Sequence, residues 1–294
     1  MKTNILITGA TGKTGLPVVE RLARMNVPFR ALVHSPAGEQ LVQKGLAEVV
    51  VGDFHEAASL DRVLEGIDRV YLLSPPSKDQ FKVQSEFVDR AKRKGVKHIV
   101  KLSALGTALD SPVGLLRAHA QIEEYIRKSG VAYTFLRPHF FMENLLMNVA
   151  TVQKDGAIYS PLGEARISTI SVEDIGSVVA TVLTTDSHAG KVYTLTGPTA
   201  VTYAEIAATL EKVIGRPVRY IQVPFEAAQQ GMVVSGMPEW FAEDLIRLMK
   251  TWSEGKGSPV TPDVENITHK TPLALREFFE LYKDRFIENA GKAA

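Results

Sequence analysis

Cysteine is absent from the 294-residue chain, and its absence excludes several kinds of chemistry. A chain without thiolates forms no disulfide, no iron–sulfur cluster and no thiolate-bound zinc site, and it has no cysteine nucleophile. The seven histidines are scattered, and none forms the His-x-x-x-His spacing of a metal-binding helix. We therefore expect neither thiol chemistry nor a bound metal ion.

Long apolar runs and a dominant charge are also missing. The apolar run at 176–183 is far shorter than the roughly 20 residues of a membrane helix, and the N-terminal region lacks the pattern of a secretion signal. Lysine and arginine number 34 against 33 aspartate and glutamate residues, and the net charge of +1 gives no electrostatic case for nucleic acid. We expect a cytoplasmic monomer or homodimer that binds a small molecule, with no membrane and no nucleic acid involved.

The first 150 residues alternate short aliphatic runs with amphipathic, charge-bearing segments. Such alternation is typical of repeated strand–helix units around a parallel sheet with helices on both faces. The predicted strands are Asn4–Thr8, Phe29–Val33, Glu48–Val51, Arg69–Leu73, His98–Leu102 and Tyr133–Arg137. The predicted helices are Gly15–Met25, Ser59–Leu64, Lys78–Lys94 and Leu116–Ser129. The sequence therefore predicts an α/β fold, a doubly wound parallel Rossmann sheet, with residues 1–150 as the dinucleotide-binding domain.

After residue 150 the pattern becomes less regular, and a smaller part is expected to follow the sheet. We expect a hairpin-like stretch, then a helix near Val172–Thr184 and a strand near Val192–Thr196 that return to the sheet within residues 165–200. Residues 201–294 are predicted to form a mostly helical C-terminal part that caps the substrate site, with helices at Tyr203–Ile214 and Leu273–Phe286. The segment Gly231–Trp240 is interpreted either as a mobile lid or as a partner surface.

A glycine-rich loop joins the first predicted strand to the first predicted helix. In a Rossmann fold the first glycine permits the tight turn, the second lets backbone amides approach a pyrophosphate, and the third lets the helix pack closely on the strand. The anion then lies at the positive N-terminal end of the helix. The loop consists of Gly9, Ala10, Thr11, Gly12, Lys13, Thr14 and Gly15. We expect it to bind the phosphates of a dinucleotide, and an ordinary strand–helix turn is the alternative.

A carboxylate is missing at the end of the second strand, where NAD-selective sites carry one. His34 and Ser35 stand there instead, and together with Lys13 they can donate hydrogen bonds to a 2′-phosphate. NADP(H) is therefore favoured, and NAD(H) remains a second option because an arginine would bind the phosphate more strongly than His34. After the third strand, Asp53 is expected on the adenine amino group and Phe54 beside the ring, with a plain strand-ending turn as the alternative.

Four motifs are spread along the chain: the glycine loop at 9–15, Gly52-Asp53 after the third strand, Thr134–Pro138 in the sixth, and Ser171–Gly176. Together they resemble the NmrA-like branch of the atypical short-chain dehydrogenases, and the resemblance runs nearly end to end. It implies a Rossmann fold that binds NADP(H). The branch includes NADPH-dependent quinone, azo-dye and triphenylmethane-dye reductases, and also non-catalytic NADP-sensing regulators.

The Tyr-x-x-x-Lys pair of ordinary short-chain dehydrogenases is absent. Matched to the resemblance, its two positions fall on Leu115 and His119, so no tyrosine can protonate a substrate carbonyl. The pattern His119-x-x-x-Glu123 is similar to that of the quinone and dye reductases, whereas regulators of the branch tend to carry lysine at His119. We take His119 and Ser103, at the end of the fifth strand, as catalytic candidates. A helix-surface pair between His119 and Glu123 is the alternative.

A quinone or conjugated dye does not require a tuned phenol for its reduction. It accepts hydride directly at an electron-poor carbon or nitrogen and takes its proton from water or from a nearby imidazole. His119, with an ordinary pKa of about 6.5, is then either a proton donor or a hydrogen-bond partner of the nicotinamide ribose.

Residues after the fourth and sixth strands complete the predicted site. Ser74 and Pro75 follow the fourth strand, where Pro75-Pro76 is expected to stiffen the loop under the nicotinamide ribose. Pro138 ends the sixth strand and is also placed at the cofactor, together with Ser103 and His119. The predicted wall of a site for a flat aromatic acceptor consists of His139, Phe140, Phe141 and Met142. A plain core role for Phe140 and Met142 is the alternative.

Two functions remain compatible with the sequence. The first is an NAD(P)H-dependent reductase that transfers hydride to a quinone-like, azo or other conjugated aromatic acceptor. The second is a regulator that binds NADP(H) without chemistry and changes its affinity for a protein partner. The missing tyrosine favours the regulator, whereas His119-x-x-x-Glu123 favours the enzyme.

Overall fold

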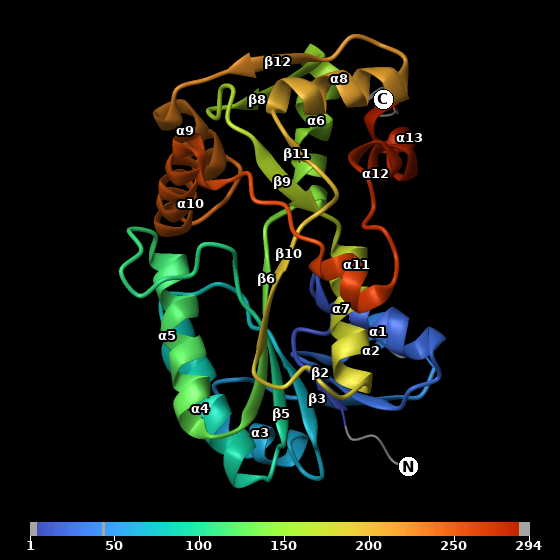
Figure 1. Ribbon diagram of the computed structural model, residues 1–294, viewed down its shortest axis with the longest axis vertical. Helices are drawn as coiled ribbons and strands as arrows, with labels where there is room; N and C mark the ends of the chain where they lie inside the picture. Colours follow the sequence, from blue (N-terminus) through green and yellow to red (C-terminus); the bar gives the residue numbers. More distant parts are fainter. Residues whose placement is uncertain (1–4, 43–44, 288–294) are drawn as a thin grey trace.

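The computed structural model describes residues 5–42 and 45–287, so Asn4 of the first predicted strand lies outside the described residues. Its centre is a sheet in the order β10-β6-β5-β4-β1-β2-β3, in which all neighbouring strands are parallel (Figure 1). The strands are β1 (Ile5–Ile7), β2 (Phe29–Val33), β3 (Ala47–Val51), β4 (Arg69–Leu72), β5 (His98–Leu102), β6 (Ala132–Pro138) and β10 (Lys191–Leu195). This order confirms the predicted Rossmann sheet, and β10 beside β6 is the strand expected near Val192–Thr196.

Helices cover both faces of the sheet (Figure 1). One face carries α1 (Gly15–Arg24), α7 (Val172–Thr184), α11 (Asp263–Thr268), and α2 (Glu39–Val42) after the short helix η1 (Pro36–Gly38). The other carries α3 (Ala57–Val63), α4 (Gln80–Arg93) and α5 (Gly114–Ser129). Each face has its own buried apolar core, and successive strand residues alternate between the two cores. This double burial explains why the strands are mostly apolar rather than alternately polar.

A smaller part lies beyond the carboxyl ends of the strands (Figure 1). It contains two short sheets, one of β8 (Ala157–Ser160) and β12 (Arg219–Gln222), the other of β9 (Ile167–Ile170) between β7 (Phe140–Phe141) and β11 (Ala200–Val201). The hairpin expected after residue 150 is wrong, because β8 and β9 pair with these distant strands and not with each other.

Helices supply most of the remaining C-terminal part. They are η2 (Met142–Asn148), α6 (Val149–Asp155), α8 (Tyr203–Ile214), α9 (Phe225–Val234), α10 (Glu239–Thr251), η3 (Trp252–Lys256), α12 (Leu275–Leu281) and α13 (Lys283–Ile287). The single helix predicted at Leu273–Phe286 is wrong, because the chain breaks at Tyr282 between α12 and α13. Apolar residues of α6, α8, α12 and α13 share a third buried core.

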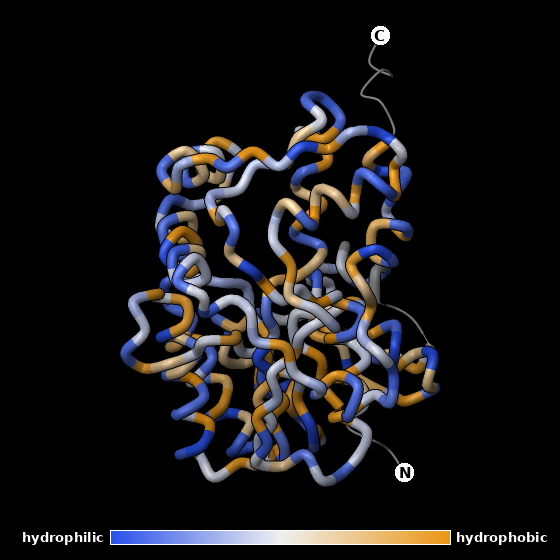
Figure 2. Tube along the Cα trace, turned by 45° about the horizontal axis from the view of Figure 1, so that its top comes forward, coloured by the Kyte–Doolittle hydropathy of each residue, from blue (hydrophilic) through white to orange (hydrophobic). Residues whose placement is uncertain are grey.

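Amphipathic patterning accounts for the way these helices pack. Figure 2 shows hydrophilic and hydrophobic stretches alternating along the helical segments. In α8 the buried residues recur at helical spacing, a Thr202–Glu205 capping box begins the helix, and Gly215 in the left-handed conformation follows its end. Among the described residues, no helix is both long and apolar enough to cross a membrane.

Candidate active site

The glycine loop follows β1 and opens directly into α1. Gly9 has a φ of +60°, which favours glycine, and the amide of Gly12 donates to the carbonyl of Gly9 at 2.9 Å. A Cβ on Gly15 would lie 2.0 Å from that same carbonyl oxygen, so close helix–strand packing requires glycine there. A Cβ on Gly12 would meet only this oxygen, at 3.1 Å. The second glycine therefore leaves space on the exposed side of the loop.

The first turn of α1 is suited to an anion. Thr14 at its N-cap makes no side-chain capping bond, and the first turn carries no acidic residue. Its amides are therefore free of a side-chain cap, and the helix dipole is positive at this end. Thr11 and Lys13 are exposed beside it, and the Lys13 ammonium donates to the side-chain oxygen of Asn144 in η2 at 2.9 Å. These residues fit the pyrophosphate of a dinucleotide.

The ends of β2 and β3 bring His34 and Asp53 together. The His34 ring is exposed, and its Nδ1 lies 3.4 Å from a carboxylate oxygen of Asp53. Ser35 is exposed beside it, whereas the Phe54 ring packs against Phe87 of α4, with ring centroids 5.3 Å apart. A carboxylate thus does stand near the end of β2, supplied by the neighbouring strand and invisible to inspection of β2 alone.

The loops after β4 and β6 are held by hydrogen bonds. Ser74 is buried and accepts a hydrogen bond from the side chain of Gln84 in α4 at 2.8 Å, while Pro75 is exposed. The carbonyl of Pro138 accepts from the amide of Leu105 at 3.0 Å, so the end of β6 is tied to the loop after β5. These predicted cofactor residues lie at the carboxyl edge of the sheet, on the strands that flank β5.

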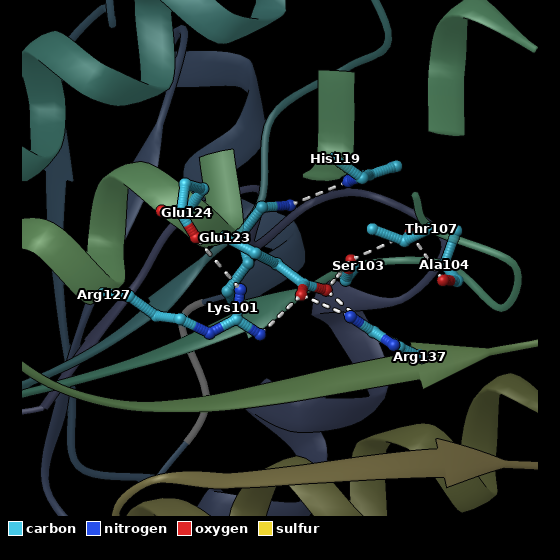
Figure 3. Close-up of polar contacts among 9 residues, drawn as sticks. All are labelled: Lys101, Ser103, Ala104, Thr107, His119, Glu123, Glu124, Arg127 and Arg137. Carbon is cyan, nitrogen blue, oxygen red and sulfur yellow. Dashed lines mark hydrogen bonds and ion pairs between the residues drawn. The ribbon is translucent and has the colours of Figure 1, made fainter. Parts of the chain in front are cut away.

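Helix α5 turns a polar face toward β5 (Figure 3). Glu123 is buried, and its carboxylate accepts hydrogen bonds from Ser103 at 2.6 Å, from Arg137 at 2.9 and 2.5 Å, and from Arg127 at 3.2 Å. His119 is buried one turn earlier and makes no bond to Glu123. The alternative of an exposed His119–Glu123 pair is therefore wrong. Glu123 instead holds Ser103 and two arginines in place.

The partner of His119 is Lys101 of β5, which sequence reasoning missed (Figure 3). The Lys101 ammonium lies 3.2 Å from His119 Nδ1 and also donates to the carbonyl of Leu102. Burial lowers the pKa of Lys101 to about 7, although the Glu123 carboxylate acts in the opposite direction. Burial, helped by the positive charge of Lys101, lowers the pKa of His119 well below its ordinary value. His119 is therefore a neutral imidazole at physiological pH.

A cavity of about 250 Å³ opens between α5, the loop after β5, and the α10–η3 segment. Leu116, three residues before His119 on α5, lines it together with Leu105, Leu248 and Trp252. The side chain of Asp244 fixes α10 against this helix by accepting the amides of Gly114 and Leu115 at 3.0 and 2.8 Å. The polar residues Asp110, Ser111, Thr251 and Lys256 also line the cavity, and one of its walls is tied to the start of α5.

The four predicted wall residues lie behind this cavity rather than along it. The rings of His139 and Phe140 contact Trp252, with centroids 5.0 and 6.0 Å apart. Met142 is fully buried in the core of the C-terminal part, and Phe141 packs against the core of the α1 face. Trp252 is the aromatic residue that faces the cavity. The sequence around Trp252 is rich in Gly and Ser, and no motif there predicted that this residue lines a site.

The segment 231–240 lies at a different place. Gly231 and Met232 line a second cavity of about 400 Å³ in the C-terminal part, together with residues of α6, α8 and α10. Within the described part of the chain, no cluster of three or more His, Asp or Glu side chains could hold a metal ion.

The sheet order, the uncapped glycine loop and the buried site on β5 and α5 define a Rossmann-type nucleotide-binding protein. The chain belongs to the NmrA-like family, whose model matches residues 1–284. This finding confirms the family predicted from the four motifs.

Individual members of the family are similar over nearly the whole chain. An NAD(P)H azoreductase of Xenophilus azovorans is 35% identical over 282 residues, which cover 96% of this chain and 99% of that protein. The structure resembles an NADPH-dependent quinone oxidoreductase from Escherichia coli in complex with NADPH, with a TM-score of 0.86, 28% identity, and coverage of 95% and 99%. It also resembles the Citrobacter sp. triphenylmethane reductase in complex with NADP(H), with a TM-score of 0.85, 26% identity, and the same coverage of both chains.

Proposed function

We propose that this chain is an NAD(P)H-dependent reductase that transfers hydride to a quinone-like, azo or other conjugated aromatic acceptor. The observation that carries the proposal is the buried Lys101–His119 pair at the same sheet edge as the uncapped glycine loop. On α5, His119 lies one turn after Leu116, which lines the cavity. Reductases of quinones and dyes among the similar proteins support the same class. The expectation of an enzyme is thereby confirmed at the level of the reductase class.

The chain's own residues supply the groups that would hold the cofactor. The loop at 9–15 and the first turn of α1 would hold the pyrophosphate, and Lys13 adds a positive charge. His34 and Ser35 are the donors available to a 2′-phosphate, and Asp53 beside His34 keeps NAD(H) a second option. When NADPH is bound, it supplies a hydride from its nicotinamide ring. NADP(H) is the cofactor in both reductase complexes that this structure resembles.

The acceptor binds in the cavity of about 250 Å³ lined by Leu105, Leu116 and Trp252. Its leucine and tryptophan side chains suit a flat conjugated ring, and Asp110 and Lys256 add charged groups to its lining. His119 contributes an imidazole whose Nε2 has no hydrogen-bond partner among the described residues, so this nitrogen is available to the nicotinamide ribose or to the acceptor. Because this imidazole is neutral at physiological pH, it acts by donating a hydrogen bond, and the proton that reduction consumes comes from water.

A regulator that binds NADP(H) without chemistry is the competing function. The absence of the Tyr-x-x-x-Lys pair favours it. Against it stands a fully buried lysine, which costs free energy unless the site uses it, and groups perturbed in this way cluster at functional sites. The enzyme therefore accounts for more of the structure.

Steady-state oxidation of NADPH with a panel of quinones and azo dyes tests the proposal. We expect turnover with at least one class of acceptor, and product formation in step with the consumption of NADPH. Tight binding of NADPH with no turnover on any acceptor would leave the regulator as the better account.

We also propose a cellular location and an assembly state for the protein. We place it in the cytoplasm, where NADPH is available, as a monomer or homodimer that acts on a small aromatic molecule. Cell fractionation and light scattering of the purified protein test these two statements.

A further inference from the structure

Lys101 occupies a position that the fold otherwise reserves for apolar side chains. It lies on β5 between Ile99 and Ser103, which face the same side of the sheet, and its partners in register on β4 and β6 are Leu72 and Phe135. Its side chain is fully buried. A buried ammonium without a compensating role is strongly unfavourable, so its contacts determine what it does.

Hydrogen-bond chemistry restricts how this lysine meets its neighbour. An ammonium group has three donors and no acceptor, so His119 Nδ1 can only accept from it. A neutral imidazole whose Nδ1 accepts must carry its proton on Nε2. The contact therefore selects one of the two tautomers, and it leaves an N–H donor on Nε2, which has no hydrogen-bond partner within residues 5–42 and 45–287.

We propose that Lys101 is a positioning residue that holds His119 in the neutral Nε2–H tautomer, so that the ring presents a donor to the cofactor or acceptor. The part of this inference that concerns turnover rests on the proposed reductase function. The part that concerns the tautomer depends only on the contacts of Lys101 and His119.

The Lys101–His119 contact takes the place of the missing Tyr-x-x-x-Lys pair. On α5 the lysine position of that pair is occupied by His119, so the helix supplies no ammonium group at this position. The strand beneath supplies it instead, and the group acts on an imidazole rather than on a phenol. The ammonium group of the site thus comes from Lys101 on β5 instead of from α5, and it donates to the imidazole of His119, which stays neutral.

The surroundings of Lys101 limit the pH range of this effect. The charged groups around it are Glu123 and Arg127 on α5 and Arg137 on β6, and the Glu123 carboxylate is shared by both arginines and Ser103. Because the pKa of Lys101 is lowered to about 7, its amine is increasingly neutral at higher pH and can then accept a hydrogen bond from an Nδ1–H. Control of the tautomer is therefore strongest below pH 7 and weakens above it.

Nitrogen-15 NMR of the cofactor-free protein tests the tautomer directly. Protonated and unprotonated ring nitrogens resonate in separate ranges, and comparison with His119→Gln identifies the signals of His119 among the seven histidines. We expect unprotonated Nδ1 and protonated Nε2 at pH 6. Lys101→Met, which keeps the length of the side chain and removes its donor, should abolish this preference. A protonated Nδ1 in the wild type, or an unchanged preference in Lys101→Met, would overturn the proposal.

Kinetics then connect the tautomer to turnover. In Lys101→Met, kcat should fall roughly 10- to 100-fold, the range for a lost partner that orients a histidine ring, while the Kd for NADPH changes little. Lys97→Met is the matched control, since Lys97 is an exposed lysine paired with Asp68, and it should leave both constants unchanged. A Lys101→Met variant with wild-type kcat would contradict the proposal. If the wild type reduces no acceptor, the proposed function fails, and the NMR result still decides the role of Lys101.

The melting temperature of Lys101→Met separates a positioning role of Lys101 from a merely structural one. Replacing a buried ammonium by an apolar side chain of similar length is often neutral or stabilising, so the melting temperature of Lys101→Met should stay close to that of the wild type. If the variant melts far below the wild type, Lys101→Arg, which keeps the charge and the donors, is measured instead. Loss of the tautomer preference in that variant would also count against the proposal, since the retained donors should preserve it.

Discussion

His119 shows how far a single residue can be interpreted before the structure is known. Its helix position and its link to the family were predictable from the spacing to the missing tyrosine. Its chemical state was not, because the two causes that lower its pKa are burial under the sheet and the charge of Lys101, which lies 18 positions earlier. Sequence reasoning gave it an ordinary pKa and two possible roles, as a proton donor or as a hydrogen-bond partner of the nicotinamide ribose, and the lowered pKa favours the second role. The lysine in an otherwise apolar strand was the one available signal.

The glycines of the loop allow a prediction that separates binding from folding. Gly12→Val should abolish binding of NADPH and leave the fold intact, because a side chain there meets only the Gly9 carbonyl oxygen at 3.1 Å and otherwise enters the space for the pyrophosphate. Gly15→Val should instead destabilise the protein, since its Cβ would lie 2.0 Å from that oxygen. Fluorescence titration with NADPH and thermal unfolding of both variants measure the two effects. Normal NADPH affinity in Gly12→Val would mean that the phosphates bind elsewhere.

Among the secondary-structure elements, those with strong local signals were predicted well. The predicted bounds of β2, β5 and α8 agree with the structure, because continuous apolar runs, helical spacing and a capping box fix them locally. Sequence reasoning did not predict how the short strands pair, because each has two to four residues and depends on a partner far along the chain. These strands are β7, β8, β9, β11 and β12. The cavity was missed for the same reason. Its walls come from β5, α5 and α10, which only the fold brings together.

Helix α5 begins without a side-chain cap of its own, and the distant Asp244 of α10 accepts its first amides. Asp244→Ala should lower the free energy of unfolding by about 1 kcal/mol, the usual cost of a lost cap. Because α10 and η3 carry Leu248 and Trp252 in the cavity wall, the KM for the acceptor should rise, whereas the Kd for NADPH should not. Chemical denaturation and initial rates measure these quantities. Glu239→Ala, an exposed position on the same helix, is the control, and equal effects of the two variants would remove the link between α10 and α5.

The stability of the whole molecule should depend on pH through its buried histidines. Burial lowers the pKa of His98 and His139 to about 4, and the pKa of His119 is also lowered, whereas the unfolded value is about 6.5. Their contribution is fully present above pH 6.5 and is lost as the pH falls to about 4, since the unfolded chain binds more protons in that window. Asp174 and Glu143 act oppositely, because burial raises their pKa values, that of Asp174 to about 6.

Burial also lowers the pKa of the partly buried His188, so four histidines stand against two carboxyl groups and the net prediction is a loss of stability on acidification. Urea unfolding should give a lower free energy at pH 5 than at pH 7.5, and His98→Gln should reduce this difference. His269→Gln changes an exposed histidine after α11 and should leave the difference as it is. A free energy that rises toward pH 5 would show that the carboxyl groups outweigh the histidines.

At the scale of the whole molecule, we propose that the glycine loop, the buried Lys101–His119 pair and the cavity beside α5 act together in a hydride-transferring reductase. Single-turnover oxidation of pre-bound NADPH on mixing with a quinone or azo dye, compared between wild type and His119→Ala, tests it most directly. The account predicts rapid oxidation in the wild type and a rate about 10²-fold lower in His119→Ala, with NADPH still bound, as expected for a lost donor at the reacting centre. NADPH that binds the wild type but is not oxidised by any acceptor, or equal rates in the two proteins, would contradict it.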